Sequence, residues 1–494
     1  MDNSKQNVFS NVIWRFAERC GAQVVSFIVS IVLARILAPE AYGTIALITV
    51  FTNILQVFVD SGLGNALIQK KDADDLDFST VFFANIAVCL LLYIGVFLCA
   101  PAIASFYNDN SLVAIVRVLS LTIVISGVKN VQQAYVSKKL IFKKFFFATL
   151  AGTVGAAVVG IVMAQKGFGV WALVAQQLFN LTVDTIVLWI TVKWRPKLMF
   201  SFKRLKKLFS YGWKLLVSAL LDTTYENVRQ LVIGKIYSSA DLAFYNKGKQ
   251  FPNLIVTNIN TSIDSVLLPT MSNEQDNKVR VRDMTRRAIK TSIFIMAPLM
   301  MGLAFTSKNI VTLLLTEKWI ECVPYLCVFC VTFMFYPIHT ANLNAIKAMG
   351  RSDLFLKMEI VKKIVGVVLL VATMYISPMA MACSLLVSGF LGQIINSWPN
   401  KKLLGYSYIE QIKDILPSIL LAVFMGVIVY LVGMLKLHTI ASLALQVVVG
   451  GVIYIVGAKI LRIDSFYYLL ELLRNILKKV GRSKKKNENF NYRC

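Results

Sequence analysis

Lysine and arginine residues recur in every second connection between the apolar stretches of this chain, and this pattern constrains the fold more than any other feature. The sequence contains fourteen apolar stretches long enough to cross a bilayer, which takes about 20 residues. Connections after the even-numbered stretches are basic, whereas the others carry few bases or none. Because basic connections stay on the cytoplasmic side, the pattern predicts a multi-pass protein of the bacterial inner membrane with both termini in the cytoplasm.

The predicted spans leave little room for protein outside the membrane. The basic connection 195–207 is expected inside, and 105–111, which has no base, is expected outside. All outer connections are short, which argues against glycan polymerases and ligases, because these usually carry a large outer loop. The predicted spans are 8–37, 41–68, 78–104, 112–137, 145–165, 168–194, 208–237, 240–268, 288–315, 323–348, 354–376, 379–399, 412–435 and 438–461.

Composition and charge exclude other classes of protein. The chain is 57% hydrophobic and has a formal net charge of +26. A soluble domain could not bury so much apolar surface. The bases lie in short connections and in the C-terminal tail, so the expected partners are anionic inner-leaflet lipids and not nucleic acid. The first apolar run is too long for a cleavable signal peptide, and no typical cleavage site follows it.

A weak internal repeat divides the chain into lobes. Trp14-Arg15 in the first span is matched by Trp213-Lys214 in the seventh. Six spans per unit is an even number, so both units would enter the membrane from the same side. We therefore expect an all-α membrane fold of two six-helix lobes, related by a pseudo-two-fold axis along the membrane normal, with two extra C-terminal helices. The expected domains are the N-lobe 1–194, a cytoplasmic linker 195–207, the C-lobe 208–399, two helices within 400–461 and a basic amphipathic tail 462–494.

Charged residues within the first span are candidate functional residues, because a charge at membrane depth is costly. Arg15, Glu18 and Arg19 are spaced by three and four residues, which places them on one face of a helix. Two other interpretations stay open. The arginines lie near the cytoplasmic end and could extend to the interface, and Glu18 could pair with either of them for structure alone.

The seventh span carries a longer polar stripe. Lys214, Asp222, Glu226 and Arg229 follow steps of eight, four and three residues around one helix face. Lipid would not tolerate such a stripe, so both charged faces are expected to line the space between the lobes.

The tenth span contains further candidates. Pro337 is expected to bend its helix, as gating helices often do. His339 could relay protons or contact substrate, and a satisfied packing histidine is at least as good an interpretation. Cys327 and Cys330 form a C-x-x-C pair without a second pair or nearby histidines, so we expect buried thiols and no metal.

In the fifth span, Gly152, Ala156 and Gly160 form a small-residue ridge typical of helix packing.

Four sequence phrases resemble a known family. They are "ARILAPEAYG" and "DSGLGNALIQ" within residues 32–71, "KGFGVWALVAQQL" at 166–178 and "AIKAMGRSD" at 345–353. The chain resembles the polysaccharide-transporter family of the multidrug/oligosaccharidyl-lipid/polysaccharide exporter superfamily, of the Wzx and TuaB type that flips O-antigen, colanic-acid and teichuronic-acid precursors. The resemblance implies two six-helix bundles around a cleft.

The same resemblance implies a function that is not enzymatic. Such proteins move undecaprenyl-diphosphate-linked oligosaccharides to the outer leaflet by alternating access, for surface polysaccharide biosynthesis. By this resemblance, Arg15, Arg19, Lys214 and Arg229 would meet the diphosphate and the glycan. The acidic residues Glu18, Asp222 and Glu226 depart from a purely cationic cavity, and they are candidates for sodium or proton coupling or for pairing with arginine. No cofactor is implied, and glycan-assembly proteins are candidate partners.

Two other functions compete with this one. A cation-coupled multidrug or small-molecule exporter of the same fold is favoured by the acidic residues, and disfavoured by fourteen spans and a cationic first helix. A membrane scaffold for glycan assembly is disfavoured by the deep charged stripes.

The tail after Leu461 alternates apolar and basic residues at helical spacing. This predicts an amphipathic helix on the inner leaflet, followed by a basic end. Membrane anchoring is favoured over a partner-docking role, because each base near an anionic surface contributes about 1 kcal/mol.

Overall fold

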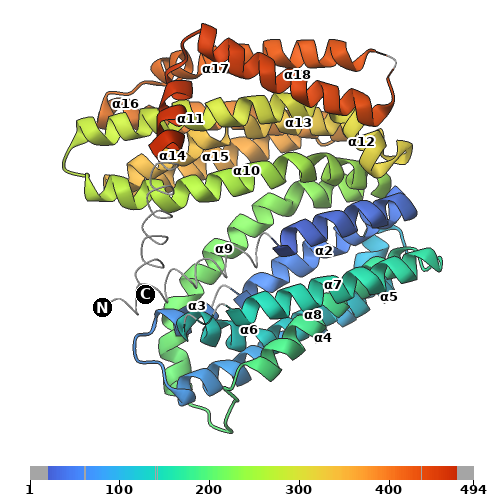
Figure 1. Cartoon of the computed structure of the whole chain (residues 1–494). Helices are drawn as coiled ribbons and strands as arrows, with labels where there is room; N and C mark the ends of the chain where they lie inside the picture. Colours follow the sequence, from blue (N-terminus) through green and yellow to red (C-terminus); the bar gives the residue numbers. More distant parts are fainter. Residues whose placement is uncertain (1–20, 61–62, 140, 142, 436, 476–494) are drawn as a thin grey trace, which may run out of the picture. The chain divides into compact units, whose positions relative to one another are not determined.

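The fold is helical throughout the part of the chain that the structure describes. This computed structural model describes residues 21–60, 63–139, 141, 143–435 and 437–475, and no strand occurs among them. Each predicted span coincides, in its described part, with one helix or with two consecutive helices (Figure 1). The prediction of an all-α membrane protein is therefore confirmed.

Contacts divide the chain into two compact units, which meet in sequence between Phe244 and Tyr245. The first unit begins with an apolar helix at Gly21–Ile36. It continues with α2 (Pro39–Asp60), α3 (Leu63–Gln69), α4 (Asp75–Tyr107), α5 (Leu112–Leu119), α6 (Leu121–Lys139), α7 (Lys143–Gln165), α8 (Val170–Thr191), α9 (Phe202–Ile236) and the start of α10 (Ser239–Asn273).

The second unit contains the rest of α10 and the helices that follow it. These are α11 (Lys278–Phe305), α12 (Ser307–Leu315), the short 3-10 helix η1 (Glu317–Trp319), α13 (Cys322–Met334), α14 (Tyr336–Ala348), α15 (Ser352–Thr373), α16 (Pro378–Leu404), α17 (Tyr408–Gly433) and α18 (Thr439–Ile460). A further helix begins at Asp464 and is described to residue 475.

The structure does not confirm the predicted number of fourteen spans. Ten helices or consecutive pairs in the described residues are long and apolar enough to cross a membrane, and Gly21–Ile36 is apolar but shorter. Helices α9, α10 and α15 coincide with predicted spans but do not reach this apolar character. The reason is chemical: α9 and α15 carry several ionisable residues along their length, and α10 is rich in asparagine, serine and threonine. The exact count of fourteen is thus not confirmed.

Helix α9 belongs to the first unit by its packing. It contacts α2, α3 and α4, although the sequence repeat makes it the first helix of the second lobe. Ion pairs hold the first turn of α9 against the start of α4. Arg204 Nη1 lies 2.6 Å from Asp74 Oδ1 and 3.2 Å from Asp77 Oδ2, at the start of α4. The predicted lobe boundaries at 194 and 208 follow the repeat and stay a prediction.

Asp74 is also the N-terminal capping residue of α4. Its carboxylate accepts a hydrogen bond from the Asp77 amide at 3.0 Å, and the Asp77 carboxylate accepts one from the Asp74 amide at 3.2 Å. This reciprocal capping box satisfies amides that the first helical turn leaves unpaired. The hydrogen bond from the Asp77 amide, together with Arg204, lowers the pKa of Asp74 to about 2.

Helices α7 and α8 pack closely because one wall of their interface is made of small residues. A side chain at Gly152 would meet Asn180 of α8 at 2.7 Å, and one at Gly160 would meet Gln176 at 3.2 Å. Ala156, between them, is buried. The predicted small-residue ridge is therefore confirmed as a helix-packing surface.

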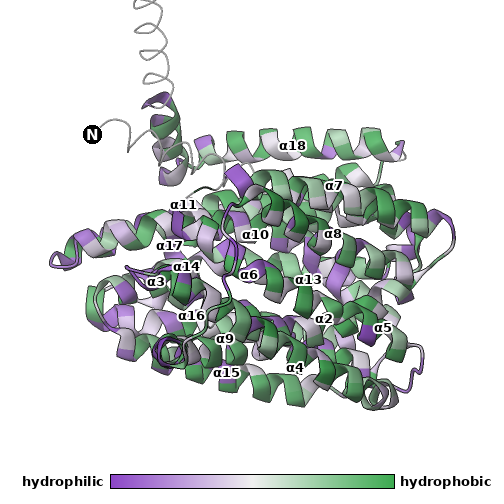
Figure 2. Ribbon diagram, turned by 90° about the horizontal axis from the view of Figure 1, so that it is seen from below, coloured by the Kyte–Doolittle hydropathy of each residue, from purple (hydrophilic) through white to green (hydrophobic). Residues whose placement is uncertain are grey.

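The outer surface of the second unit is apolar. Phe424 of α17 and Val447 and Val448 of α18 are 59%, 65% and 62% exposed. Figure 2 shows hydrophobic residues along most helices and hydrophilic ones concentrated at helix ends and connections. Exposed apolar surface of this extent suits contact with lipid and not with water.

Candidate functional site

Helix α9 presents the predicted polar stripe. Lys214, Asp222 and Glu226 are exposed, whereas Arg229 is only 4% exposed. Helix α9 packs on α2 and α4, which are apolar enough to span a membrane, and the stripe lies within the predicted seventh span. The structure thus brings three of the four α9 candidates to an accessible surface and buries the fourth. Asp222 and Arg229 each make interactions with other groups.

The candidates in the first span cannot be placed in the same way. Arg15, Glu18 and Arg19 lie outside the described residues. Their predicted role at the diphosphate stays a prediction.

An ion pair inside the first unit was missed by sequence reasoning. Lys129 Nζ of α6 lies 2.9 Å from Asp184 Oδ2 of α8, and the two side chains are 15% and 14% exposed. Both residues lie within predicted spans, so a scan for every ionisable residue at membrane depth would have found them. Charges at this depth usually pair with one another, and only the fold shows which residues do so.

A second polar contact lies beside this ion pair. Asp60, near the end of α2, accepts hydrogen bonds from Asn130 Nδ2 at 3.2 Å and from Gln56 Nε2 at 3.1 Å. Lys129 is close enough to Asp60 to act on it electrostatically. Helices α2, α6 and α8 therefore bring two carboxylates and one amine together at membrane depth. Asp60 was noted only as part of the repeat, because its partners are distant in sequence.

Pro337 stands where the tenth predicted span divides. Helix α13 ends at Met334, and α14 begins at Tyr336 with the proline in its first turn. A proline is tolerated there because the first amides of a helix need no partner within it. The helix is interrupted at Phe335, two residues before the proline, and the bend itself stays a prediction. A gating role for it stays a prediction.

His339 is enclosed by the same region of the second unit. Its Nδ1 lies 2.9 Å from Asn396 Nδ2 of α16, and the ring also forms a hydrogen bond with the Gly389 backbone. A side chain at Gly392 would meet the His339 ring at 3.2 Å and the Lys362 chain at 3.5 Å. Because the ring is enclosed and its Nδ1 has a partner in Asn396, this geometry favours packing over the proton-relay alternative.

A buried amide network connects α14, α16 and α17. Asn342, Asn400 and Gln411 are fully buried. Asn342 Oδ1 accepts from Asn400 Nδ2 at 2.7 Å and from Gln411 Nε2 at 3.1 Å, while Asn342 Nδ2 donates to Gln411 Oε1 at 2.9 Å. Asn400 Oδ1 has no hydrogen-bond partner among the described residues, but the other amide contacts join the three helices. Such a buried network fixes the relative positions of its helices, and a structural role explains it.

The ionisable residues within the predicted spans are typical of one class of membrane protein, the transporters. Ionisable residues at membrane depth are retained where a substrate or ion must pass, because lipid makes them costly elsewhere. The chain places them on α9 and between α2, α6 and α8, within a multi-pass helical fold.

The particular family follows from sequence comparison. The chain belongs to the family described as polysaccharide biosynthesis protein, whose model matches residues 32–324. It is 26% identical over 394 residues to the teichuronic acid biosynthesis protein TuaB of Bacillus subtilis, covering 78% of this chain and 81% of that protein. It is 24% identical over 411 residues to the lipopolysaccharide biosynthesis protein WzxC of Escherichia coli, with coverages of 80% and 83%.

Solved structures share the fold. The inward closed lipid II flippase MurJ superposes with a TM-score of 0.73 and 16% identity, covering 92% of this chain and 99% of that one. An inward-facing multidrug resistance MATE transporter of the MOP superfamily gives 0.61 at 16% identity, with coverages of 78% and 94%. The predicted membership of the polysaccharide family is therefore confirmed, and the solved structures show that the fold is shared.

Proposed function

We propose that this protein is a flippase that moves undecaprenyl-diphosphate-linked oligosaccharide to the outer leaflet of the bacterial inner membrane by alternating access. The activity is transport, without a covalent step. The relatives named for teichuronic acid and lipopolysaccharide biosynthesis support a precursor of a surface polysaccharide as the substrate.

The observation that carries the proposal is the accessible polar stripe of α9. A diphosphate needs charged donors to leave water, and Lys214 supplies an exposed amine within the predicted seventh span. The glycan needs hydrogen-bonding groups beside the phosphate. The polyprenyl chain needs only lipid, so the protein does not have to enclose it.

Orientation and coupling complete the proposal. Positive-inside charge supports cytoplasmic termini, and the basic connections support contact with anionic lipids. Asp222 and Glu226 are exposed carboxylates on the same helix as Lys214, which supports sodium or proton coupling at or beside the substrate site. Glycan-assembly proteins are proposed partners.

A matched pair of lysine variants tests the substrate site. In a strain without the chromosomal gene, Lys214→Ala should lower surface polysaccharide and leave lipid-linked oligosaccharide in the membrane. Lys206→Ala removes the same charge two turns earlier on α9, also from an exposed position, and should export normally. Normal surface polysaccharide in the strain without any copy of the gene would refute the function. Equal effects of the two variants, at equal protein levels, would refute the site.

The second candidate is a cation-coupled small-molecule exporter. It is favoured by the two carboxylates on α9 and by the fold shared with a MATE transporter. This function predicts that loss of the gene raises sensitivity to cationic drugs while surface polysaccharide stays normal. A flippase predicts the reverse.

A further inference from the structure

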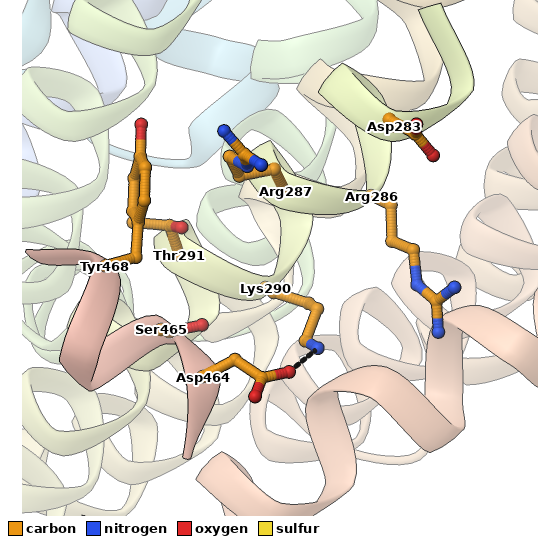
Figure 3. Close-up of a pocket in the computed structure, with 8 residues that line it drawn as sticks. All are labelled: Asp283, Arg286, Arg287, Lys290, Thr291, Asp464, Ser465 and Tyr468. Carbon is orange, nitrogen blue, oxygen red and sulfur yellow. Dashed lines mark hydrogen bonds and ion pairs between the residues drawn. The ribbon is translucent and has the colours of Figure 1, made fainter. Parts of the chain in front are cut away.

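A pocket of about 300 Å³ lies in the second unit, between the first half of α11 and the helix that begins at Asp464 (Figure 3). This region follows the basic connection after the eighth predicted span, so positive-inside charge places it on the cytoplasmic side. Its lining is polar and contains three bases and one aromatic ring: Asp283, Arg286, Arg287, Lys290, Thr291, Asp464, Ser465 and Tyr468.

Two of the three bases are already neutralised. Lys290 Nζ lies 2.7 Å from Asp464 Oδ2, and this pair joins α11 to the C-terminal helix. Arg286 forms two hydrogen bonds of 2.7 Å with the carboxylate of Asp414 in α17. These contacts hold the walls of the pocket together and leave little charge on those two bases for an anion.

Arg287 is different. Its guanidinium carbon lies 5.0 Å from the centre of the Tyr468 ring, and it forms no ion pair with any carboxylate in the described residues. Asp283, one turn earlier on α11, points away from it in Figure 3. A guanidinium stacked on a ring keeps its edge donors available in a fixed plane, which is the geometry that phosphate oxygens require.

The surroundings of the pocket suit a lipid. Helix α18 is a membrane-spanning helix that ends at Ile460, four residues before Asp464. Ile460 and Leu461 are 73% and 58% exposed. Leu472, one turn beyond Tyr468 on the same helix face, is also exposed. Apolar side chains thus remain uncovered at the end of α18 and on the C-terminal helix that lines the pocket, where we expect the chain to leave the membrane.

We propose that this pocket binds the phosphate of an anionic phospholipid of the cytoplasmic leaflet, with its acyl chains beside the exposed end of α18. Arg287 donates to the phosphate oxygens, and Thr291 provides a hydroxyl on the same face of α11, one turn further along. A bound headgroup would bridge α11 and the C-terminal helix, and it would add to the Lys290–Asp464 contact. This is a defined site, distinct from the diffuse attraction of a basic tail to the membrane, and it does not depend on the substrate carried.

Thermal unfolding of the full-length protein in neutral detergent tests the site. The probes are phosphatidylglycerol, phosphatidylcholine and inorganic phosphate, each titrated at the same concentrations. Phosphatidylglycerol should raise the unfolding temperature of the wild-type protein, and the other two should not. Arg287→Gln should need about tenfold more phosphatidylglycerol for the same rise, as expected when one charge-assisted contact is lost.

Lys278→Gln is the matched control. It removes one exposed charge from the first turn of the same helix, outside the pocket, and should respond as the wild type does. Equal responses of the two variants would overturn the proposal in favour of diffuse attraction, and an equal effect of inorganic phosphate would overturn it in favour of a free-anion site. If Arg287→Gln fails to fold, Tyr468→Leu replaces it, and an unchanged phosphatidylglycerol response in that variant would also overturn the proposal.

Discussion

Breaking the Lys129–Asp184 ion pair should destabilise the first unit strongly. Lys129→Met leaves the Asp184 carboxylate without its amine, in a position where its side chain is only 14% exposed. Removing one partner of a fully buried pair costs about 3–5 kcal/mol. Because some solvent reaches both side chains, we expect about 3 kcal/mol for Lys129→Met, at the lower end of that range.

The double variant separates the pair from its surroundings. Lys129→Met with Asp184→Asn removes both charges, so neither desolvation penalty remains, and the loss should be within about 1 kcal/mol of wild type. The coupling free energy between the two positions should then be at least about 2 kcal/mol, and larger by whatever Asp184→Asn costs alone. The exposed pair Lys197–Asp75, with side chains 62% and 48% exposed, is the control and should show coupling below about 1 kcal/mol.

Denaturant-induced unfolding in mixed micelles provides the measurement, with all variants compared at one pH and one ionic strength. If the losses from the two single substitutions simply add in the double variant, the pair contributes no coupling and the reasoning is wrong. Transport by the double variant distinguishes the remaining roles. Retained export indicates a structural pair, whereas lost export with near-normal stability indicates a pair used during transport.

Three further predictions concern packing, pH and the amide network. Gly43→Ala should lower stability by about 1–3 kcal/mol, because its Cβ would lie 1.7 Å from a backbone oxygen of the first residue of α10; Gly95→Ala, with open space around it, should not. The pKa of Asp74 is lowered to about 2, so its stabilisation is fully present above the unfolded pKa of about 4 and is lost as the pH falls from there through the folded pKa of about 2. The difference in melting temperature between wild type and Asp74→Asn should therefore shrink between pH 5 and pH 2.5. Asn342→Leu should cost about 1–3 kcal/mol for each partner left unsatisfied, measured by unfolding, and a change below 0.5 kcal/mol would show that Gln411 finds other partners.

The candidate site could be predicted only in part. Regular spacing revealed the α9 stripe, because residues three and four apart share a helix face whatever the tertiary structure. The ion pair of Lys129 with Asp184 joins residues on α6 and α8, and no spacing rule connects two helices. His339 illustrates the opposite limit. The sequence shows a histidine within a predicted span, but its contact with Asn396 of α16 comes from the packing.

The sequence by itself determined the helical membrane class, the order of the helices and the expected orientation, since apolar length and loop charge act locally along the chain. It also determined the family, through the match to residues 32–324. The tertiary structure decided where helices divide, as at Pro337, and which charges pair. It also placed α9 against α2 and α4 in the first unit. These features depend on contacts between residues that are distant in sequence, where side-chain volume, ion pairing and hydrogen bonding select one arrangement among many with the same hydrophobic pattern.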